Sequence, residues 1–485
     1  MSCQVVDSLF RTASIAILAR ILIPEYFGLI SMVTAITVIT EQFKDFGLSQ
    51  ATVQQKTITQ EQISNLFWIN ATIGFVLMVL VSLASSLIAR FYNEQRLIYI
   101  TIALSSGFLS SGLAVQHQAL LQRQMKLATI GVIQLGSTVI STVIAIILAL
   151  KGYGYWALVW REISRSFFIA LGTWTCCPWT PNFPKKNIKI GHMLSFGRHI
   201  AGFNVIVFLS ASLDQILIGK LYGPGQLGLY RQAYYLIFFP VMQLATPISR
   251  VTEPALSFLQ DDPDRYRKFY KKMLTTLSFG VMPLALFVAV YSHNIVLVVL
   301  GEKWIEASDI FRIFAISAFI RPASDTTLSL LITCGKTKRF FNLGLVTSLI
   351  LVLSFSIGVK WGALGVAYGY VIGTYVLTVL RLCYSFKDTP VNVKTFFTAI
   401  EKPLKGSFAM AAVLLVFNKC VFITNNLLLL SIALPIAGAT YLLTWMLTSS
   451  GKETLGEMVN DFTTPLHLDK YITLIGSLKK RAKCV

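Results

Sequence analysis

Charged side chains inside long apolar stretches are the residues of this chain whose chemistry needs explaining. A charge within such a stretch is unfavourable and usually marks a polar cavity or an ion pair. A guanidinium presents its donors in a planar fork, so it binds phosphate or carboxylate oxygens two at a time. Seven arginines lie within apolar stretches: Arg11, Arg161, Arg165, Arg198, Arg231, Arg312 and Arg321.

Four acidic residues lie in the same stretches, and three of them fall one helical turn from an arginine. At a spacing of three or four residues, opposite charges meet on one helix face and can form an ion pair. The fourth, Asp214, has no cation within four residues before it. It is a candidate proton or sodium site, or a partner for a neighbouring helix. The three spaced pairs are Asp7–Arg11, Glu162–Arg165 and Arg321–Asp325.

Arginines near the middle of two stretches suggest where an anion could bind. Arg165 shares a helix face with Arg161, and Arg321 falls at a comparable depth in the second half of the chain. Arg231 lies nearer one end of its stretch, within LYRQAYYL, whose tyrosines could stack on sugar rings or form an interfacial belt. We therefore predict that Arg161, Arg165, Arg231 and Arg321 line an anion-binding cavity. Three acids are predicted to couple ions or to support the structure: Asp214, Asp325 and Asp7.

Composition identifies the class of protein in which these charges lie. Of 485 residues, 55% are hydrophobic and 13% charged, whereas soluble domains carry about 25% charged residues. The chain is therefore predicted to be an all-α polytopic membrane protein. Its net charge of +20 lies largely in short loops between apolar runs, which favours a membrane face over nucleic acid. The seven cysteines show no metal-ligand spacing, and no cofactor or metal site is predicted.

Apolar stretches long enough to cross a bilayer, about 20 residues, recur along the chain. We expect about fourteen transmembrane helices. Their approximate bounds are 3–22, 26–43, 63–89, 97–117, 127–150, 154–175, 194–219, 226–250, 273–300, 309–334, 340–359, 361–383, 404–424 and 427–448. The first begins almost at Met1, which suggests a chain shortened at its N-terminus.

A repeated motif divides these helices into two halves. LARILIPEYFGL at 18–29 recurs at an offset of 200 residues, so that Pro24 aligns with Pro224 and Gly28 with Gly228. Proline lacks an N–H and fits the start of a helix, so each copy predicts a tight hairpin between two helices. Six helices separate the copies, which therefore share one side of the membrane. The halves are predicted to be parallel repeats.

The predicted organisation is two six-helix lobes, two further helices and a basic tail. With both termini placed in the cytoplasm, the inner loops carry more than twice as many lysines and arginines as the outer loops. The predicted parts are a first lobe over 1–177, an inter-lobe loop over 178–191, a second lobe over 192–386, a charged linker over 387–403, helices 13 and 14 over 404–449 and a cytoplasmic tail over 450–485.

Several motifs resemble Wzx-type polysaccharide flippases of the multidrug/oligosaccharidyl-lipid/polysaccharide exporter superfamily. They are ARILIPEYFGL, DFGLSQATVQQ (45–55), FWIN (67–70), GYGYWALV (152–159) and LDQILIGKLYGPGQLGLY (213–230). The resemblance implies a bacterial inner-membrane flippase that moves polyprenyl-pyrophosphate-linked oligosaccharides to the periplasmic leaflet by alternating access. It also implies membrane lipids, a polysaccharide polymerase and a chain-length regulator as partners.

Two other functions are weighed against this one. An ion-coupled multidrug exporter of the same superfamily would favour an acidic, aromatic cavity for cationic drugs, whereas intramembrane arginines outnumber acids here. A membrane glycan polymerase or glycosyltransferase would need a sizeable loop with catalytic carboxylates or a metal-binding acidic motif, and the outer loops are short. No catalytic residue is predicted, and no nucleic-acid partner.

Overall fold

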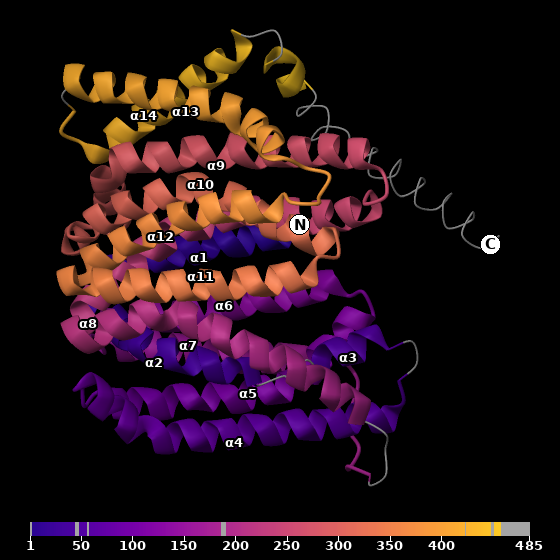
Figure 1. Ribbon diagram of the computed structural model, residues 1–485. Helices are drawn as coiled ribbons and strands as arrows, with labels where there is room; N and C mark the ends of the chain where they lie inside the picture. The colour runs from indigo at the N-terminus through magenta and orange to yellow at the C-terminus, as the bar shows by residue number, and fades with distance from the viewer. Residues whose placement is uncertain are drawn as a thin grey trace. The chain divides into compact units, whose positions relative to one another are not determined.

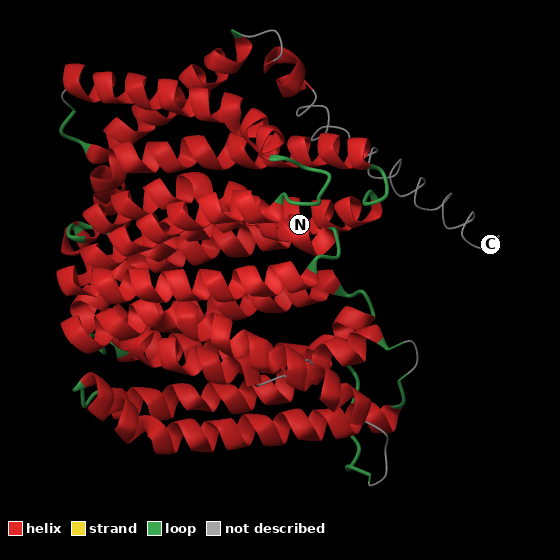
Figure 2. Cartoon of the chain, in the orientation of Figure 1, coloured by secondary structure: helices red, strands yellow, loops and turns green. Residues whose placement is uncertain are grey.

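The computed structural model describes residues 2–43, 48–55, 58–185, 191–421, 423–447 and 451–456, with only the backbone described over 191–211. Every regular element in these ranges is a helix (Figure 2). The α-helices are α1 (Ser2–Ile21), α2 (Pro24–Phe43), α3 (Leu48–Gln54), α4 (Gln60–Tyr92), α5 (Leu97–Arg123), α6 (Leu127–Leu150), α7 (Trp156–Cys176), α8 (Gly191–Phe258), α9 (Pro263–Val299), α10 (Ala307–Thr333), α11 (Thr337–Gly358), α12 (Gly362–Ser385), α13 (Val393–Cys420) and α14 (Asn426–Met446).

The predicted apolar stretches all fall on helices, and α8 contains two of them. The short helix α3 was not predicted, because its seven residues, LSQATVQ, contain no apolar run. Six helical segments are long and apolar enough to cross a membrane: 60–92, 97–123, 127–150, 263–299, 337–385 and 426–446. Helices α1, α2, α7, α8, α10 and α13 are outside this set, so the count of fourteen spans stays a prediction.

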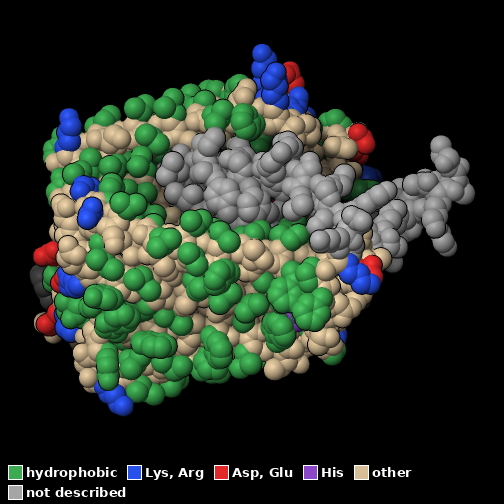
Figure 3. Space-filling view, turned by 90° about the horizontal axis from the view of Figure 1, so that it is seen from below, with side chains coloured by type: hydrophobic (Ala, Val, Ile, Leu, Met, Phe, Trp, Pro, Cys, Tyr) green, Lys and Arg blue, Asp and Glu red, His purple; other side chains and the backbone are tan. Residues whose placement is uncertain are grey.

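The surface of the molecule supports a membrane location. Leu83 on α4 is 73% exposed and Tyr99 on α5 is 67% exposed. Large apolar side chains in such numbers on the outside are the reverse of a soluble fold and fit contact with lipid. Figure 3 shows hydrophobic side chains across the middle of one face, with lysine, arginine and acidic side chains gathered toward its edges. The chain is a multi-pass α-helical membrane protein.

The described helices pack as two compact units. Unit 1 comprises residues 1–243, 292–317 and 336–381, and unit 2 comprises 244–291, 318–335 and 382–485. In unit 1, neighbours in sequence such as α4 and α5 lie side by side and antiparallel (Figure 1). The units do not coincide with the predicted lobes, 1–177 and 192–386, so that division stays a prediction.

Both repeated motifs form the predicted hairpins, and both lie in unit 1. Helix α2 begins at Pro24, after a two-residue turn. Helix α8 turns at Gly223, whose φ of 79° and ψ of −178° interrupt the helix directly before Pro224. The arms of this second hairpin face each other, since the Tyr230 hydroxyl on one arm donates a 2.8 Å hydrogen bond to Asp214 on the other.

Candidate functional site

Four arginines and two acids from three helices of unit 1 come together; we call them the arginine cluster. The guanidinium of Arg165 on α7 interacts electrostatically with Arg11 on α1, with Arg161, and with the carboxylates of Asp7 and Glu162. Arg231 on α8 belongs to the same group, because the charges of Arg11, Arg161, Arg231 and Asp7 all act on one hydroxyl, that of Tyr235. The cluster thus contains four arginines and two carboxylates, and Asp214 on α8 adds a third negative charge that acts on Arg231.

Arg165 has a buried donor without a partner among the described residues. It lies in the middle of α7, and the donor is its Nε. Glu162 makes its ion pair with Arg161, at 3.2 Å. The expected Glu162–Arg165 pair is therefore replaced by one between sequence neighbours, whose long side chains reach each other. An incompletely satisfied guanidinium away from bulk water favours an additional anionic partner.

Asp7 supplies the second negative charge of the cluster from α1. Its Oδ1 is buried and accepts no hydrogen bond from the described residues, although Arg11 follows one turn later and its charge reaches Arg165. Both side chains are half-buried. Asp7 therefore balances part of the positive charge without saturating any one guanidinium.

The three tyrosines around Arg231 have different surroundings. Tyr235 is half-buried, stacks on Phe239 with ring centroids 4.8 Å apart, and lies among the charges of the cluster. Tyr230 is 1% exposed, and its hydroxyl donates a hydrogen bond to Asp214. Tyr234 packs against Phe314 and Tyr370. Only Tyr235 of the three is thus placed beside the cluster, where it could stack on a ligand.

Asp214 is satisfied within its own hairpin. It is 4% exposed, accepts the Tyr230 hydroxyl at 2.8 Å and accepts the backbone N–H of Gln215 at 2.7 Å. These contacts correspond to the structural alternative considered for this residue, a bond across neighbouring helices. Its use as an ion-coupling acid stays a prediction.

Arg321 and Asp325 form the predicted ion pair on α10, in unit 2. Their charged atoms lie 3.6 Å apart, and the side chains are 26% and 36% exposed. On the same helix, the Ser329 hydroxyl donates to Glu253 at 2.7 Å. Within unit 1 the structure therefore brings together Arg161, Arg165, Arg231 and Asp7, and within unit 2 it pairs Arg321 with Asp325.

Arg11 is the cluster residue that sequence reasoning left out of the binding site. Its spacing to Asp7 predicted a self-contained ion pair on α1. Arg11 lies deep within an apolar stretch, as Arg165 does, and this depth is the signal that could have placed Arg11 in the predicted cavity.

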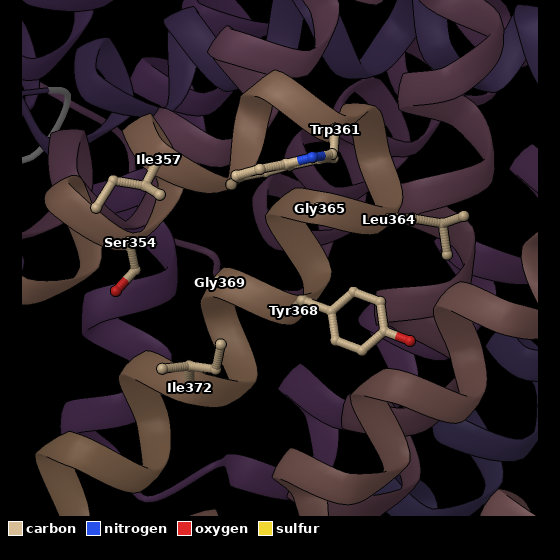
Figure 4. A pocket seen from close by; sticks show the side chains of 9 residues that line it. Ser354, Ile357, Trp361, Leu364, Gly365, Tyr368, Gly369 and Ile372 are labelled. Carbon is tan, nitrogen blue, oxygen red and sulfur yellow. The ribbon is translucent and has the colours of Figure 1, made fainter.

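An apolar groove on unit 1 has a different character. It has a volume of about 560 Å³ and lies between α11 and α12. Figure 4 shows its lining, in which the rings of Trp361 and Tyr368 flank a glycine-lined stretch of α12. Its lining contains no charged side chain, so the groove suits a hydrocarbon chain and not an anion. Among the described residues, no three His, Cys, Asp or Glu side chains are grouped to hold a metal ion.

Fold and site together define a class: a multi-pass α-helical membrane protein with paired hairpins and an arginine cluster among apolar helices. A family model described as "Polysaccharide biosynthesis protein" matches residues 17–309. This is more than half of the chain, and the chain belongs to that family.

Curated relatives agree with this assignment, and a solved structure shares the fold. Lipopolysaccharide biosynthesis protein WzxC of Escherichia coli (strain K12) is 26% identical over 371 residues, 75% of each chain. Teichuronic acid biosynthesis protein TuaB of Bacillus subtilis (strain 168) is 27% identical over 399 residues, 78% of this chain and 79% of that one. The fold is similar to that of lipid II flippase MurJ in an inward closed conformation, with a TM-score of 0.74 at 17% identity over 91% and 96% of the two chains.

Proposed function

We propose that this protein is a flippase that moves polyprenyl-pyrophosphate-linked oligosaccharides across the membrane for polysaccharide biosynthesis. The observation that carries the proposal is the excess of arginine over acid in the cluster, with Arg165 incompletely satisfied. The names of the relatives, which are proteins of lipopolysaccharide and teichuronic acid biosynthesis, support it.

A diphosphate is the chemical group that matches the cluster. Each guanidinium can donate two parallel hydrogen bonds to phosphate oxygens, and these charge-assisted bonds strengthen where water is excluded. Arg11, Arg161, Arg165 and Arg231 would share the phosphates, and Tyr235 would stack on the first sugar. Asp7 would offset part of the repulsion between the guanidinium groups when the site is empty. The sequence also predicts that Arg321 lines the cavity, but its ion pair with Asp325 on α10 favours a structural role for it.

The same charge balance speaks against the two other candidate functions. A pump for cationic drugs would meet repulsion at a cluster with a net positive charge. A glycosyltransferase or polymerase would need paired carboxylates or a metal poised beside a reacting sugar. In the cluster, Glu162 is paired with Arg161. We therefore propose transport without bond making or breaking.

We place the protein in the bacterial inner membrane with both termini in the cytoplasm and the repeated hairpins on the periplasmic side. Loop charge supports this orientation. A cysteine at exposed Leu221, in the second hairpin, should react with an impermeant maleimide added to intact cells. A cysteine at exposed Gln260, between α8 and α9, should react only after permeabilisation. The opposite pattern would overturn the orientation.

Translocation by the purified protein tests the function itself. In proteoliposomes, a fluorescent polyprenyl-diphosphate saccharide should become accessible to a reagent outside the vesicle faster than in vesicles with Arg165→Glu protein. The same saccharide on an uncharged polyprenol should move no faster than in empty vesicles. Equal rates for charged and uncharged lipids would contradict the proposal. In cells, we expect the protein to work beside a polysaccharide polymerase and a chain-length regulator.

A further inference from the structure

The two repeated hairpins touch each other through their glycines, in a reciprocal way. A Cβ added to Gly28 would lie 2.5 Å from the carbonyl carbon of Pro224 and closer still to its oxygen. A Cβ added to Gly228 would lie 2.7 Å from the carbonyl carbon of Pro24 and 3.2 Å from the Gly28 nitrogen. Neither site has room for a methyl group, because the obstacle on each side is backbone. We call this contact the hairpin latch.

The basic residues that end the first arms make matching contacts across the repeat. Arg20, before the first hairpin, donates to the backbone carbonyl of Val298 at the end of α9. Lys220, at the aligned position before the second hairpin, lies over the ring of Phe91 at the end of α4, 5.2 Å from its centroid. Each hairpin thus contacts a helix end from the other half of the chain.

Further contacts tie each hairpin down. Near the first hairpin, Lys303 donates to the Ile21 carbonyl at 3.0 Å and Trp304 donates to the Ala19 carbonyl at 2.8 Å. At the second, the Tyr222 hydroxyl donates to the Val359 carbonyl at 2.7 Å. All of these residues belong to unit 1. The latch therefore lies within a network of backbone contacts contributed by both halves.

The arginine cluster lies behind this network along α8. Arg231 follows Gly223 by eight residues, about 12 Å along a helix that rises 1.5 Å per residue. Because α8 carries both the second hairpin and Arg231, separating the hairpins would open a route toward Arg231 from their side of the membrane.

We propose that Gly28 and Gly228 form a conformational latch that holds the hairpin end of unit 1 closed and that must separate when this end opens. The absence of a Cβ at both positions allows backbone to pack on backbone, a contact made of many weak interactions that can be broken and remade. The proposal rests on the proposed function only in that a transporter opens to both sides in turn.

Cysteine accessibility tests the latch without requiring transport. Labelling of Leu221→Cys first identifies the side of the membrane on which the hairpins lie. Tyr235→Cys, in a background without native cysteines, then reports access to the cluster from that side. Gly28→Ala and Gly228→Ala should each raise the labelling rate of Tyr235→Cys from that side by about tenfold or more, since the methyl group prevents closure. Gly225→Ala is the matched control: it lies in the same hairpin, and an added Cβ there meets no atom within 4 Å. It should leave the rate unchanged.

If an alanine variant fails to accumulate, substitutions that add no bulk test the latch instead. Arg20→Gln and Lys220→Gln remove the cation contacts and should raise the labelling rate in the same direction by a smaller factor. Folded Gly28→Ala and Gly228→Ala proteins that label as slowly as the parent would overturn the latch. So would an equal rise in Gly225→Ala, or glutamine variants that leave labelling unchanged. A latch that behaves as proposed in a protein that moves no lipid-linked saccharide would refute only the proposed function.

Discussion

The charged groups of the two units differ in how fully they are balanced. In unit 1, four arginines from α1, α7 and α8 share the carboxylates of Asp7 and Glu162, with Asp214 acting on Arg231, and Arg165 Nε has no hydrogen-bond partner among the described residues. In unit 2, Arg321 faces Asp325 one turn away on the same helix, 3.6 Å apart. The first arrangement needs several helices to assemble, whereas the ion pair of the second forms between two residues of α10.

This difference separates a charge that serves the structure from one that serves a ligand. An i,i+4 pair neutralises itself and lets its helix enter a membrane. A cluster with surplus positive charge is stabilised when an anion joins it, so its unfavourable empty state favours binding. Perturbing the two regions should therefore affect different properties: export for the cluster, and folding for the pair.

Charge reversal in the cluster should have the largest effect. Arg165→Glu replaces a donor to phosphate by a group that repels it, and we expect at least a 100-fold loss of polysaccharide export, from the loss of a charged hydrogen bond plus repulsion. Export is measured as surface polysaccharide in a complemented deletion strain, with membrane abundance determined on the same cells. Normal export by an Arg165→Glu protein of normal abundance would show that the cluster does not bind the transported lipid.

Milder substitutions of Arg165 should distinguish the contribution of the bidentate guanidinium geometry from that of its positive charge. Arg165→Ala loses the charged hydrogen bonds, worth about 1.5–3 kcal/mol, so transport in proteoliposomes should fall about tenfold or more. Arg165→Lys keeps the charge but loses the bidentate geometry and should lie between Ala and the parent. If Lys were as poor as Ala while both proteins stayed folded, charge would not be the property that matters.

The pair in unit 2 should respond chiefly through stability. Arg321→Ala leaves Asp325 without its ion-pair partner, and because both side chains are partly exposed we expect a loss of about 1 kcal/mol, less than for a fully buried pair. Arg321→Ala with Asp325→Ala should regain the melting temperature in detergent and export within about threefold of the parent. A double variant that is stable but inactive would instead place Arg321 in the binding site.

An exposed ion triad should give the smallest effect. Arg96, between α4 and α5, contacts Glu94 at 2.7 Å and Glu25 at 2.6 Å. The hydrogen bond from Arg96 holds the pKa of Glu94 below its ordinary value of 4.5. A group with a lower pKa in the folded state stabilises above its unfolded pKa and loses this contribution as pH falls through the folded one.

The purified protein should therefore lose a few tenths of a kcal/mol as pH drops below about 4.5, since the triad is partly exposed to solvent. Glu94→Gln should flatten this part of the pH profile of the melting temperature. A profile that is unchanged in Glu94→Gln would show that the triad contributes nothing measurable to stability.

The fold was largely predictable because apolar run length and helix-breaking residues act locally. Pro24 and the Gly223–Pro224 pair marked both hairpins, and both formed as predicted. What could not be predicted was the contact between the hairpins: two motifs 200 residues apart show similarity in sequence but give no sign that Gly28 and Gly228 pack together. Helix α3 was missed because its stability comes from packing on α5, not from an apolar run.

The site was predictable residue by residue but not as an assembly. Depth within an apolar stretch singled out Arg161, Arg165 and Arg231, which α7 and α8 bring together, and their role in binding stays a prediction. Helical spacing assigned Glu162 to Arg165, whereas the structure pairs it with Arg161, and spacing gave no sign that the charge of Arg11 reaches Arg165. Spacing describes a single helix, whereas the cluster is made by three.

Binding of a diphosphate lipid to the purified protein tests the central claim most directly. Geranyl diphosphate and geraniol share one hydrocarbon chain and differ in the anionic group, so their affinities in detergent, measured by calorimetry, isolate the contribution of the cluster. We predict that the diphosphate binds more tightly than the alcohol, that Arg165→Ala weakens the diphosphate about tenfold or more, and that the Arg321→Ala/Asp325→Ala variant binds within about threefold of the parent. Equal affinities for the two lipids, or an Arg165→Ala protein that binds the diphosphate as tightly as the parent, would contradict the account.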